Sequence, residues 1–247
     1  MKRKISIILC LCFWLPMLTF NNALAHKSEP GTQTLVDTIT DPNGRLNAKY
    51  EPSYTLYCSA VLITPNTWLT AKHCAGNEKK TGYIGAVYPG QSGISTPFGM
   101  MDISTYIPDP AEDIAIIKGT DRDKTTAYKY YITGFDTAIY EYDLKDLEEL
   151  VGQTIYSYGY PGDKGGFKQY KSVGIITAIN PRTWELSTSM PAVGGQSGSG
   201  VYLNNGHLLG ILYGNESRAG WSIKTAKIHP IDYRLKTWIE KYKVKKS

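Results

Sequence analysis

Short apolar runs separated by Gly, Pro, Asn and Asp recur along most of this chain. They are rich in β-branched and aromatic residues, and they include residues 54–57, 60–63, 114–117, 154–157, 174–179 and 200–203. Runs of this length and composition, bounded by turn residues, are typical of strands. Many short strands predict an all-β chain of the barrel or sandwich class.

Two local patterns add detail to this prediction. Asn204, Asn205 and Gly206 separate two apolar runs and predict a hairpin turn, because Asn and Gly accept positive φ. After His229, Pro230 is suited to a first helical position, and the residues that follow have helical spacing. We therefore expect a C-terminal amphipathic helix capped near His229.

The most polar stretch, residues 136–149, holds six acidic residues and one lysine. We interpret it as the linker between two halves of the chain, with a short helix at about 144–150. It divides the chain into residues 36–135 and 136–247.

The N-terminus has the pattern of a cleavable leader. Three basic residues precede the apolar stretch 5–20, and Ala23-Leu24-Ala25 forms a small-x-small cleavage site. The alternative is a retained membrane anchor, but the stretch is short for a spanning helix and contains Pro16. We expect residues 1–25 to be removed, 26–35 to be a possible short pro-segment, and the protein to be secreted.

Removal of the leader changes both charge and cysteine content. The full chain has 27 basic and 22 acidic residues, and loss of the three basic residues of the leader leaves a net charge of +2. This charge is too small to indicate nucleic-acid binding. Only Cys58 and Cys74 remain, and in an oxidising compartment they indicate one disulfide closing a loop of 74 − 58 = 16 residues. Such a link stabilises by ~3 kcal/mol. Two free thiols are the alternative.

Residues 194–200 point most clearly to catalytic chemistry, because Ser197 lies among several glycines there. Glycines here allow a tight turn that exposes a serine hydroxyl. The same turn would direct the N–H groups of Gly195 and Ser197 at one point, where they stabilise an oxyanion. A plain Gly/Ser-rich turn is the structural alternative.

A nucleophilic serine needs a base and an orienting carboxylate. His73 ends an apolar strand beside Cys74, which would fix it against a rigid support. Asp113 precedes the apolar run 114–117, where a buried carboxylate needs a partner such as an imidazole. The other candidates are expected to be structural or solvated histidines, or surface loop acids: His26, His207, His229, Asp109, Glu112 and Asp121.

Three segments together resemble the catalytic blocks of chymotrypsin-like serine proteases: residues 69–74 around His73, 113–116 and 195–199. The chain looks most like the bacterial glutamyl endopeptidases of the V8 type and the exfoliative-toxin-like enzymes. Residues 41–44 and 159–164 support this, and the resemblance covers about residues 36–240. It implies two packed antiparallel β-barrels with a C-terminal α-helix, the triad between them, and a disulfide bracing the histidine loop.

The resemblance places the specificity pocket at Ala192, Val193, Leu212 and Asn215. At these positions the chain departs from the pattern of the family. Family members that prefer glutamate have a histidine where this chain has Leu212 and a hydroxyl residue shortly before the nucleophile. A substrate carboxylate buried against Leu212 and Val193 would lack a partner. We expect an apolar or small P1 residue (the residue before the scissile bond), unless Lys224 or Lys227 reaches the pocket.

A second departure is Gln196. Animal relatives have an aspartate at this position, which pairs with a freed N-terminal amine on activation. A neutral amide cannot form that ion pair.

Together these features predict a secreted serine endopeptidase that acts on proteins or peptides as a monomer, without metal, cofactor, nucleic acid or membrane. The alternatives are a glutamate-specific endopeptidase, a catalytically silent protein that binds through the same fold, and an esterase. The esterase is disfavoured because the chain lacks the Gly-x-Ser-x-Gly elbow and the order Ser, Asp, His.

Overall fold

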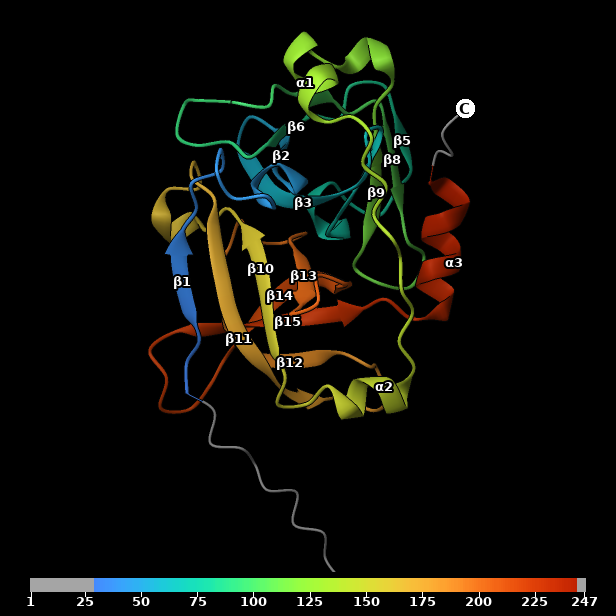
Figure 1. The fold of residues 1–247 in the computed structure, drawn as a ribbon. Coiled ribbons are helices and arrows are strands. Elements are labelled where there is room, and N and C mark those ends of the chain that lie inside the picture. Colours follow the sequence, from blue (N-terminus) through green and yellow to red (C-terminus); the bar gives the residue numbers. More distant parts are fainter. Residues whose placement is uncertain (1–28, 244–247) are drawn as a thin grey trace, which may run out of the picture.

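The computed structural model describes residues 29–243 and arranges them in two curled antiparallel sheets (Figure 1). The predicted leader, residues 1–25, lies outside the described residues. The all-β prediction with a C-terminal helix is confirmed, and the two sheets pack against each other along a shared core.

The first sheet forms a curled half-barrel from strands between Asn47 and Lys118. Its eight strands within the described residues follow the order β5-β8-β9-β4-β3-β2-β6-β7. Their bounds are β2 (Asn47–Ser53), β3 (Leu56–Thr64), β4 (Thr67–Thr70), β5 (Lys80–Thr81), β6 (Ala86–Pro89), β7 (Met101–Asp102), β8 (Thr105–Pro108) and β9 (Ala115–Lys118). The predicted run 54–57 is divided, because residues 54 and 55 form the turn between β2 and β3.

The second sheet closes into a barrel, because β12 pairs with β11 as well as with β15. Its order in the described part of the chain is β1-β11-β10-β13-β14-β15-β12. The bounds are β1 (Thr32–Leu35), β10 (Thr154–Gly159), β11 (Tyr170–Ile179), β12 (Leu186–Pro191), β13 (Gly200–Leu203), β14 (Leu208–Ser217) and β15 (Lys224–Pro230). The hairpin predicted at residues 204–206 joins β13 to β14, and residues 32–35 of the predicted pro-segment pair with β11.

Three α-helices and four short 3-10 helices connect the strands between residues 29 and 243. They are α1 (Thr126–Tyr131), α2 (Leu144–Glu149), α3 (Tyr233–Tyr242), η1 (Gly44–Leu46), η2 (Lys72–Cys74), η3 (Asp121–Asp123) and η4 (Gly162–Lys164). The short helix predicted at 144–150 is confirmed as α2. No helix of the described chain has the length and apolar character needed to cross a membrane.

The start predicted for the last helix is wrong. Strand β15 continues through His229 and Pro230, and α3 begins only at Tyr233. Its N-cap is Asp232, whose carboxylate accepts a hydrogen bond from the N–H of Leu235 at 2.7 Å. Proline lacks an N–H to share with a neighbouring strand, but it is tolerated where a strand ends. Strand β15 therefore includes Pro230, the residue at which helical spacing predicted the start of α3.

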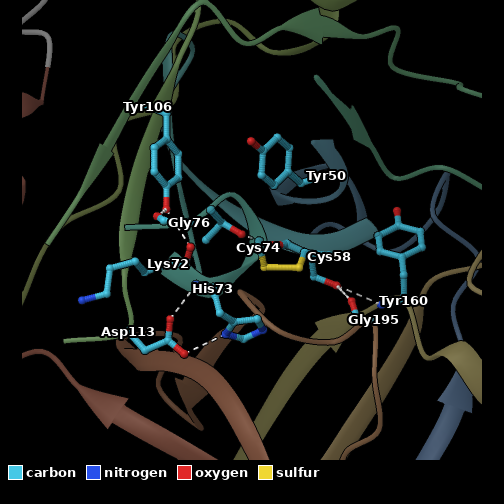
Figure 2. Close-up of a disulfide and its surroundings, with 12 residues drawn as sticks. Tyr50, Cys58, Lys72, His73, Cys74, Gly76, Tyr106, Asp113, Tyr160 and Gly195 are labelled. Atoms are coloured by element: carbon cyan, nitrogen blue, oxygen red, sulfur yellow. Dashed lines mark hydrogen bonds and ion pairs between the residues drawn. A yellow bond between two sulfur atoms is a disulfide. The ribbon is translucent and has the colours of Figure 1, made fainter. Parts of the chain in front are cut away.

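The predicted disulfide between Cys58 and Cys74 is confirmed, and their Cα atoms lie 6.2 Å apart (Figure 2). It joins the interior of β3 to the end of η2, and both cysteines are buried in the core of the first sheet. The loop that carries His73 is therefore anchored covalently at its next residue.

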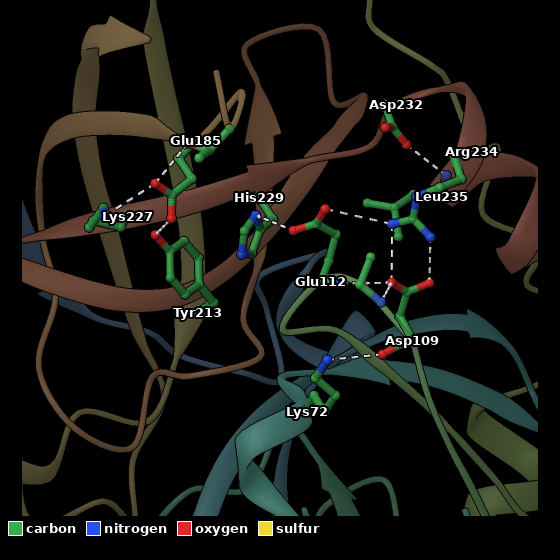
Figure 3. Close-up of polar contacts among 12 residues, drawn as sticks. Lys72, Asp109, Glu112, Glu185, Tyr213, Lys227, His229, Asp232, Arg234 and Leu235 are labelled. Atoms are coloured by element: carbon green, nitrogen blue, oxygen red, sulfur yellow. Dashed lines mark hydrogen bonds and ion pairs between the residues drawn. The ribbon is translucent and has the colours of Figure 1, made fainter. Parts of the chain in front are cut away.

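Asp109 contradicts its expected place on the surface, because it is 1% exposed. Its carboxylate accepts two hydrogen bonds from the Arg234 guanidinium, at 2.8 and 3.0 Å (Figure 3). The backbone N–H groups of Ala111 and Glu112 donate to it as well. Burial alone would raise the pKa of Asp109, but these donors outweigh burial and lower it. The pair ties α3 to the first sheet.

We expect Asp109→Ala to lower the free energy of unfolding by about 1–3 kcal/mol. The Arg234 guanidinium and the N–H groups of Ala111 and Glu112 lose their acceptor, although Arg234 keeps Glu112 at 3.8 Å. Urea denaturation followed by tryptophan fluorescence measures this.

The matched control is Glu149→Ala, because the side chains of Glu149 and its partner Lys145 are 69% and 82% exposed. Equal stability of the two variants would contradict the structural role of Asp109.

Candidate active site

His73 and Asp113 meet because of strand register. Strands β4 and β9 are antiparallel neighbours in which Thr70 lies opposite Ala115. His73 follows Thr70 by three residues and Asp113 precedes Ala115 by two, so both leave the sheet at the same edge. The 3-10 turn η2 then directs the chain at His73 back toward Asp113.

Two hydrogen bonds join these residues (Figure 2). His73 Nδ1 lies 2.7 Å from Asp113 Oδ2, and the backbone N–H of His73 donates to Asp113 Oδ1 at 2.8 Å. The hydrogen bond to Asp113 raises the pKa of His73, although burial opposes it. Burial would raise the pKa of Asp113, but the bonds from His73 outweigh burial and lower it. The arrangement holds an imidazole next to an ionised carboxylate.

The loop that carries Ser197 is held against strand β3 by Ser59. The backbone N–H of Ser59 donates to the carbonyl of Ser197 at 2.8 Å, and its hydroxyl donates to the carbonyl of Gly195 at 2.9 Å. The hydroxyl also accepts from the N–H of Tyr160 at 3.1 Å. A Cβ at Gly198, where φ is +89°, would lie 2.1 Å from the Ser59 carbonyl, so this contact requires glycine. Ser59 is a residue that the sequence analysis missed.

Two backbone donors of this loop are free. Within residues 29–243, the N–H groups of Gly195 and Ser197 have no hydrogen-bond acceptor. The carbonyl of Gly194 accepts from the N–H of Gly162 at 2.8 Å. Since a trans peptide directs its C=O and N–H to opposite sides, the N–H of Gly195 points away from Gly162. The loop thus offers two unused donors on either side of Gln196.

Ser197 is near the histidine loop but is not bonded to it. Its hydroxyl makes no hydrogen bond with any other described residue, so this structure joins His73 to Asp113 only. The connection runs through the chain: Ser59 holds Ser197, and the adjacent Cys58 is bonded to Cys74 beside His73. Side-chain contacts of catalytic groups often tighten only when substrate is bound.

A cavity of 460 Å³ lies beside the residues that precede Ser197. Its wall includes Ala192 and Val193 but neither Leu212 nor Asn215. Leu212 is 1% exposed and packs inside the second barrel, while Asn215 is exposed on β14. The structure therefore groups only Ala192 and Val193 of the four predicted pocket residues.

The lysines in this region differ in whether they line the cavity. Lys224 and Lys164 belong to its wall. Lys227 does not, because its ammonium group pairs with Glu185 at 3.5 Å and lies 5.6 Å from the centre of the Tyr213 ring. Of the two lysines proposed from sequence, only Lys224 borders the cavity.

Gln196 is fully buried and connects the loop to the N-terminal strand. Its Oε1 accepts from the N–H of Val193 at 3.0 Å and from Nε2 of Gln33 at 3.3 Å. Its Nε2 donates to the hydroxyl of Ser172 at 3.2 Å. Neutral hydrogen bonds to strand β1 thus occupy the side chain at this position.

His229 also lies close to Asp113, although the sequence indicated a helix cap. It is 8% exposed, its Nδ1 lies 3.3 Å from Glu112 Oε2, and its ring stacks on Tyr213 at 4.0 Å (Figure 3). Burial lowers the pKa of His229, which favours the neutral ring. His229, Glu112 and Asp113 line a cavity of 640 Å³, and neither cysteine of the disulfide belongs to its wall.

Comparison with known proteins gives a family match over most of the chain. Residues 58–211 match the model of the trypsin-like peptidase domain. A glutamyl endopeptidase of Bacillus licheniformis is 32% identical over 155 residues, which are 59% of this chain and 45% of that protein. An extracellular metalloprotease of Bacillus subtilis is 27% identical over 169 residues, 65% of this chain and 50% of that protein. The chain thus spans about half the length of the curated relatives it matches.

A solved structure described as Glu endopeptidase in complex with MPD covers 88% of this chain and 98% of its own, with a TM-score of 0.67 and 21% identity. At that identity the likeness shows a shared fold.

The name of the Bacillus subtilis relative raises the question of a metal. In the described residues, potential ligand atoms of Cys58, His73 and Cys74 lie within 4.8 Å of one another. Both sulfurs are bonded to each other, so they offer no thiolate, and this group does not fit a metal ion.

The hydroxyl of Ser59 supports the nucleophile loop, so Ser59→Ala should lower stability and slow the chemistry of Ser197. The buried N–H of Tyr160 loses its acceptor, for which we expect a loss of about 1–3 kcal/mol. Labelling of Ser197 by a fluorophosphonate should slow roughly tenfold, the change that ~1.4 kcal/mol of barrier produces. Denaturation and labelling kinetics measure the two effects.

Ser157→Ala is the matched control, since the Ser157 hydroxyl is buried on β10 without a partner. It should change neither quantity appreciably. Unchanged labelling in a folded Ser59→Ala protein would show that Ser59 does not position the loop.

Proposed function

Because the chain belongs to the trypsin-like peptidase domain family, we propose that it is a serine endopeptidase with His73, Asp113 and Ser197 as its catalytic triad. The observation that carries this proposal is the doubly hydrogen-bonded His73–Asp113 pair, joined to the Ser197 loop through Ser59 and the disulfide. Asp113 accepts from Nδ1 and so leaves Nε2 of His73 as the proton acceptor for the serine hydroxyl.

The proposed reaction proceeds through an acyl-enzyme. Ser197 Oγ attacks the scissile carbonyl while His73 takes its proton, and the imidazolium then protonates the leaving amine as the C–N bond breaks. Water gives a proton to His73 as it attacks the acyl carbonyl. The C–O bond to Ser197 then breaks as His73 returns that proton to Oγ, which releases the acid. The free N–H groups of Gly195 and Ser197 stabilise the oxyanion, and losing one such donor lowers kcat by roughly 10²–10³.

We further propose that the cavity bordered by Ala192 and Val193 receives the P1 side chain and favours apolar or small residues. Pro191 and Ile223 extend its apolar wall, and neither Leu212 nor Asn215 adds a polar group to it. A carboxylate placed there would need a partner among the polar side chains of the wall, which are Gln33, Lys164, Ser222 and Lys224.

Glutamate at P1 is the alternative, and one observation favours it. Lys224 and Lys164 border the same cavity, so a cation is available to a substrate carboxylate. The relatives named glutamyl endopeptidase support this alternative as well. Asp163 in the same wall works against it, because a nearby carboxylate repels a second one.

Secretion and protein or peptide substrates belong to the same proposal. The leader-like residues 1–25 and the Cys58–Cys74 disulfide fit an extracellular compartment, and one relative is named an extracellular metalloprotease. A monomeric state stays a prediction, and so does the lack of nucleic-acid binding, which follows from the small net charge.

The first test is to incubate the purified protein with a denatured mixed proteome and to map new cleavage sites by mass spectrometry. We expect the wild type to cut and Ser197→Ala to be inactive, since it has no nucleophile. Apolar or small residues before the cuts would support the P1 proposal. Glutamate would contradict it, and loss of that preference in Lys224→Ala would then assign recognition to Lys224.

If the wild-type protein neither cuts nor reacts with a fluorophosphonate, the endopeptidase proposal fails. A protein that binds through a silent protease fold would be the remaining interpretation.

The pH profile tests the role of Asp113. His73 must be neutral to accept a proton, and its pKa is raised above the ordinary 6.5 mainly by Asp113. The rate should therefore fall as the pH drops through this raised value. Asp113→Asn should move the fall to lower pH and reduce kcat by about 10⁴. Measuring kcat/KM from pH 5 to 9 checks this, with Asp121→Asn as the exposed control. An acid limb that does not move would show that Asp113 does not act on His73.

A further inference from the structure

Strand β2 carries a buried cation that the function proposed above does not use. Lys49 is 2% exposed, and its ammonium group pairs with Glu51 at 2.6 Å. The same ammonium group lies over two aromatic rings, 4.7 Å from the centre of Tyr57 and 4.4 Å from the centre of Phe167. A buried charge needs such partners, and cation–π contacts strengthen when the cation is desolvated. These contacts fix the ring of Tyr57 next to Lys49.

The ring of Tyr57 packs on the loop that carries Ser197. A Cβ built on Gly195, where φ is +92°, would lie 2.5 Å from Cε2 of Tyr57. Only glycine allows the ring to approach the backbone this closely, because the Cβ of any other residue would overlap with it. The ring therefore lies against the Cα of a residue whose N–H binds the oxyanion in the proposed mechanism.

Tyr57 also contacts the segment that holds the other side of the same peptide unit. A Cβ built on Gly166 would lie 2.1 Å from the Tyr57 hydroxyl oxygen, and one built on Gly162 would lie 3.1 Å from it. The N–H of Gly162 donates at 2.8 Å to the carbonyl of Gly194, which shares a peptide unit with the N–H of Gly195. That unit is thus held at its carbonyl by Gly162 and at the following Cα by Tyr57. Because the peptide is planar, these two contacts set the direction of its N–H.

Tyr57 acts here through its ring and not through its hydroxyl group. The hydroxyl makes no hydrogen bond with any other described residue. Burial, and after it the carboxylate of Asp163, raise the pKa of Tyr57, so the phenol is neutral at neutral pH. Phenylalanine in its place would keep the ring over which Lys49 lies. Leucine would keep apolar volume but would lose the planar π face.

We propose that Tyr57 is a positioning residue for the oxyanion-binding N–H of Gly195, and that Lys49 fixes the ring that does this. The proposal rests on the proposed endopeptidase function. Tyr57 acts through the backbone of Gly195, so its loss should weaken binding of the transition state more than binding of the substrate. Such a change lowers kcat and leaves KM nearly constant.

The test compares Tyr57→Leu with the conservative Tyr57→Phe on a peptide that the wild type cleaves. We expect Tyr57→Leu to lower kcat at least roughly tenfold, since misplacing a donor costs part of the roughly 10²–10³ that its loss costs. Tyr57→Phe should stay within about twofold of the wild type. The matched control is Tyr54→Leu, at a fully exposed tyrosine in the turn between β2 and β3, which should also stay within about twofold.

A peptide aldehyde measures the oxyanion site separately from folding. Its carbonyl carbon bonds to Ser197 Oγ as His73 takes the serine proton, and the carbonyl oxygen becomes an oxyanion facing the two N–H groups. The matching peptide alcohol binds without that bond. The advantage of the aldehyde over the alcohol should shrink roughly tenfold in Tyr57→Leu and should persist in Tyr57→Phe. Lys49→Met, which removes the cation, should shrink it roughly threefold, and this variant carries the test if Tyr57→Leu does not fold.

An unchanged kcat and aldehyde advantage in a folded Tyr57→Leu protein, or an equal loss in Tyr57→Phe, would overturn the proposal. So would a rise in KM alone, which would make Tyr57 a substrate contact instead. A Lys49→Met protein with the wild-type advantage would contradict the role of Lys49. If the wild type neither cleaves peptides nor reacts with a fluorophosphonate, the proposed function fails, and the role of Tyr57 fails with it.

Discussion

The pairing of β4 with β9 is the constraint on which the candidate site depends. Thr70 lies opposite Ala115, and this register sets His73 against Asp113 at the end of the two strands. Both strands are buried, so a slip by one residue would turn core side chains to the wrong face. The same hydrophobic pattern that fixes the first sheet therefore also fixes the distance between imidazole and carboxylate.

Contacts at two ends of the interface between the sheets hold the second barrel next to the His73–Asp113 pair. At one end Ser59 binds the carbonyls of Gly195 and Ser197, next to the disulfide. At the other end Arg234 of α3 binds the buried Asp109, four residues before Asp113. A shared core lies between, with residues from both sheets and α3. Loosening either end would let the nucleophile loop move relative to His73.

Patterns within short segments of the sequence predicted most of the fold, whereas contacts between residues far apart in the sequence were missed. The strand runs, the hairpin at 204–206 and the disulfide depend on neighbouring residues or on cysteine counting. Asp109 was taken for a surface charge because its partner Arg234 lies 125 positions away. Helix α1 escaped prediction because it spans only six residues and buries only Tyr128. Ser59 carried no signal beyond its place after Cys58.

Leu212 shows why matching one position to a family does not transfer its role. Its side chain packs in the core of the second barrel, while its backbone accepts from the N–H of Gly198 at 2.7 Å and donates to the carbonyl of Ser199 at 2.9 Å. Through these bonds Leu212 supports the nucleophile loop by backbone contacts alone. The cavity beside the loop is instead bordered by Val193 and by Lys224, whose side chain is exposed. Substitution of Lys224 can therefore change the charge that a substrate meets without disturbing the barrel. A polar residue in place of Leu212 would instead lie in the core of the barrel, where burial of a polar group is unfavourable.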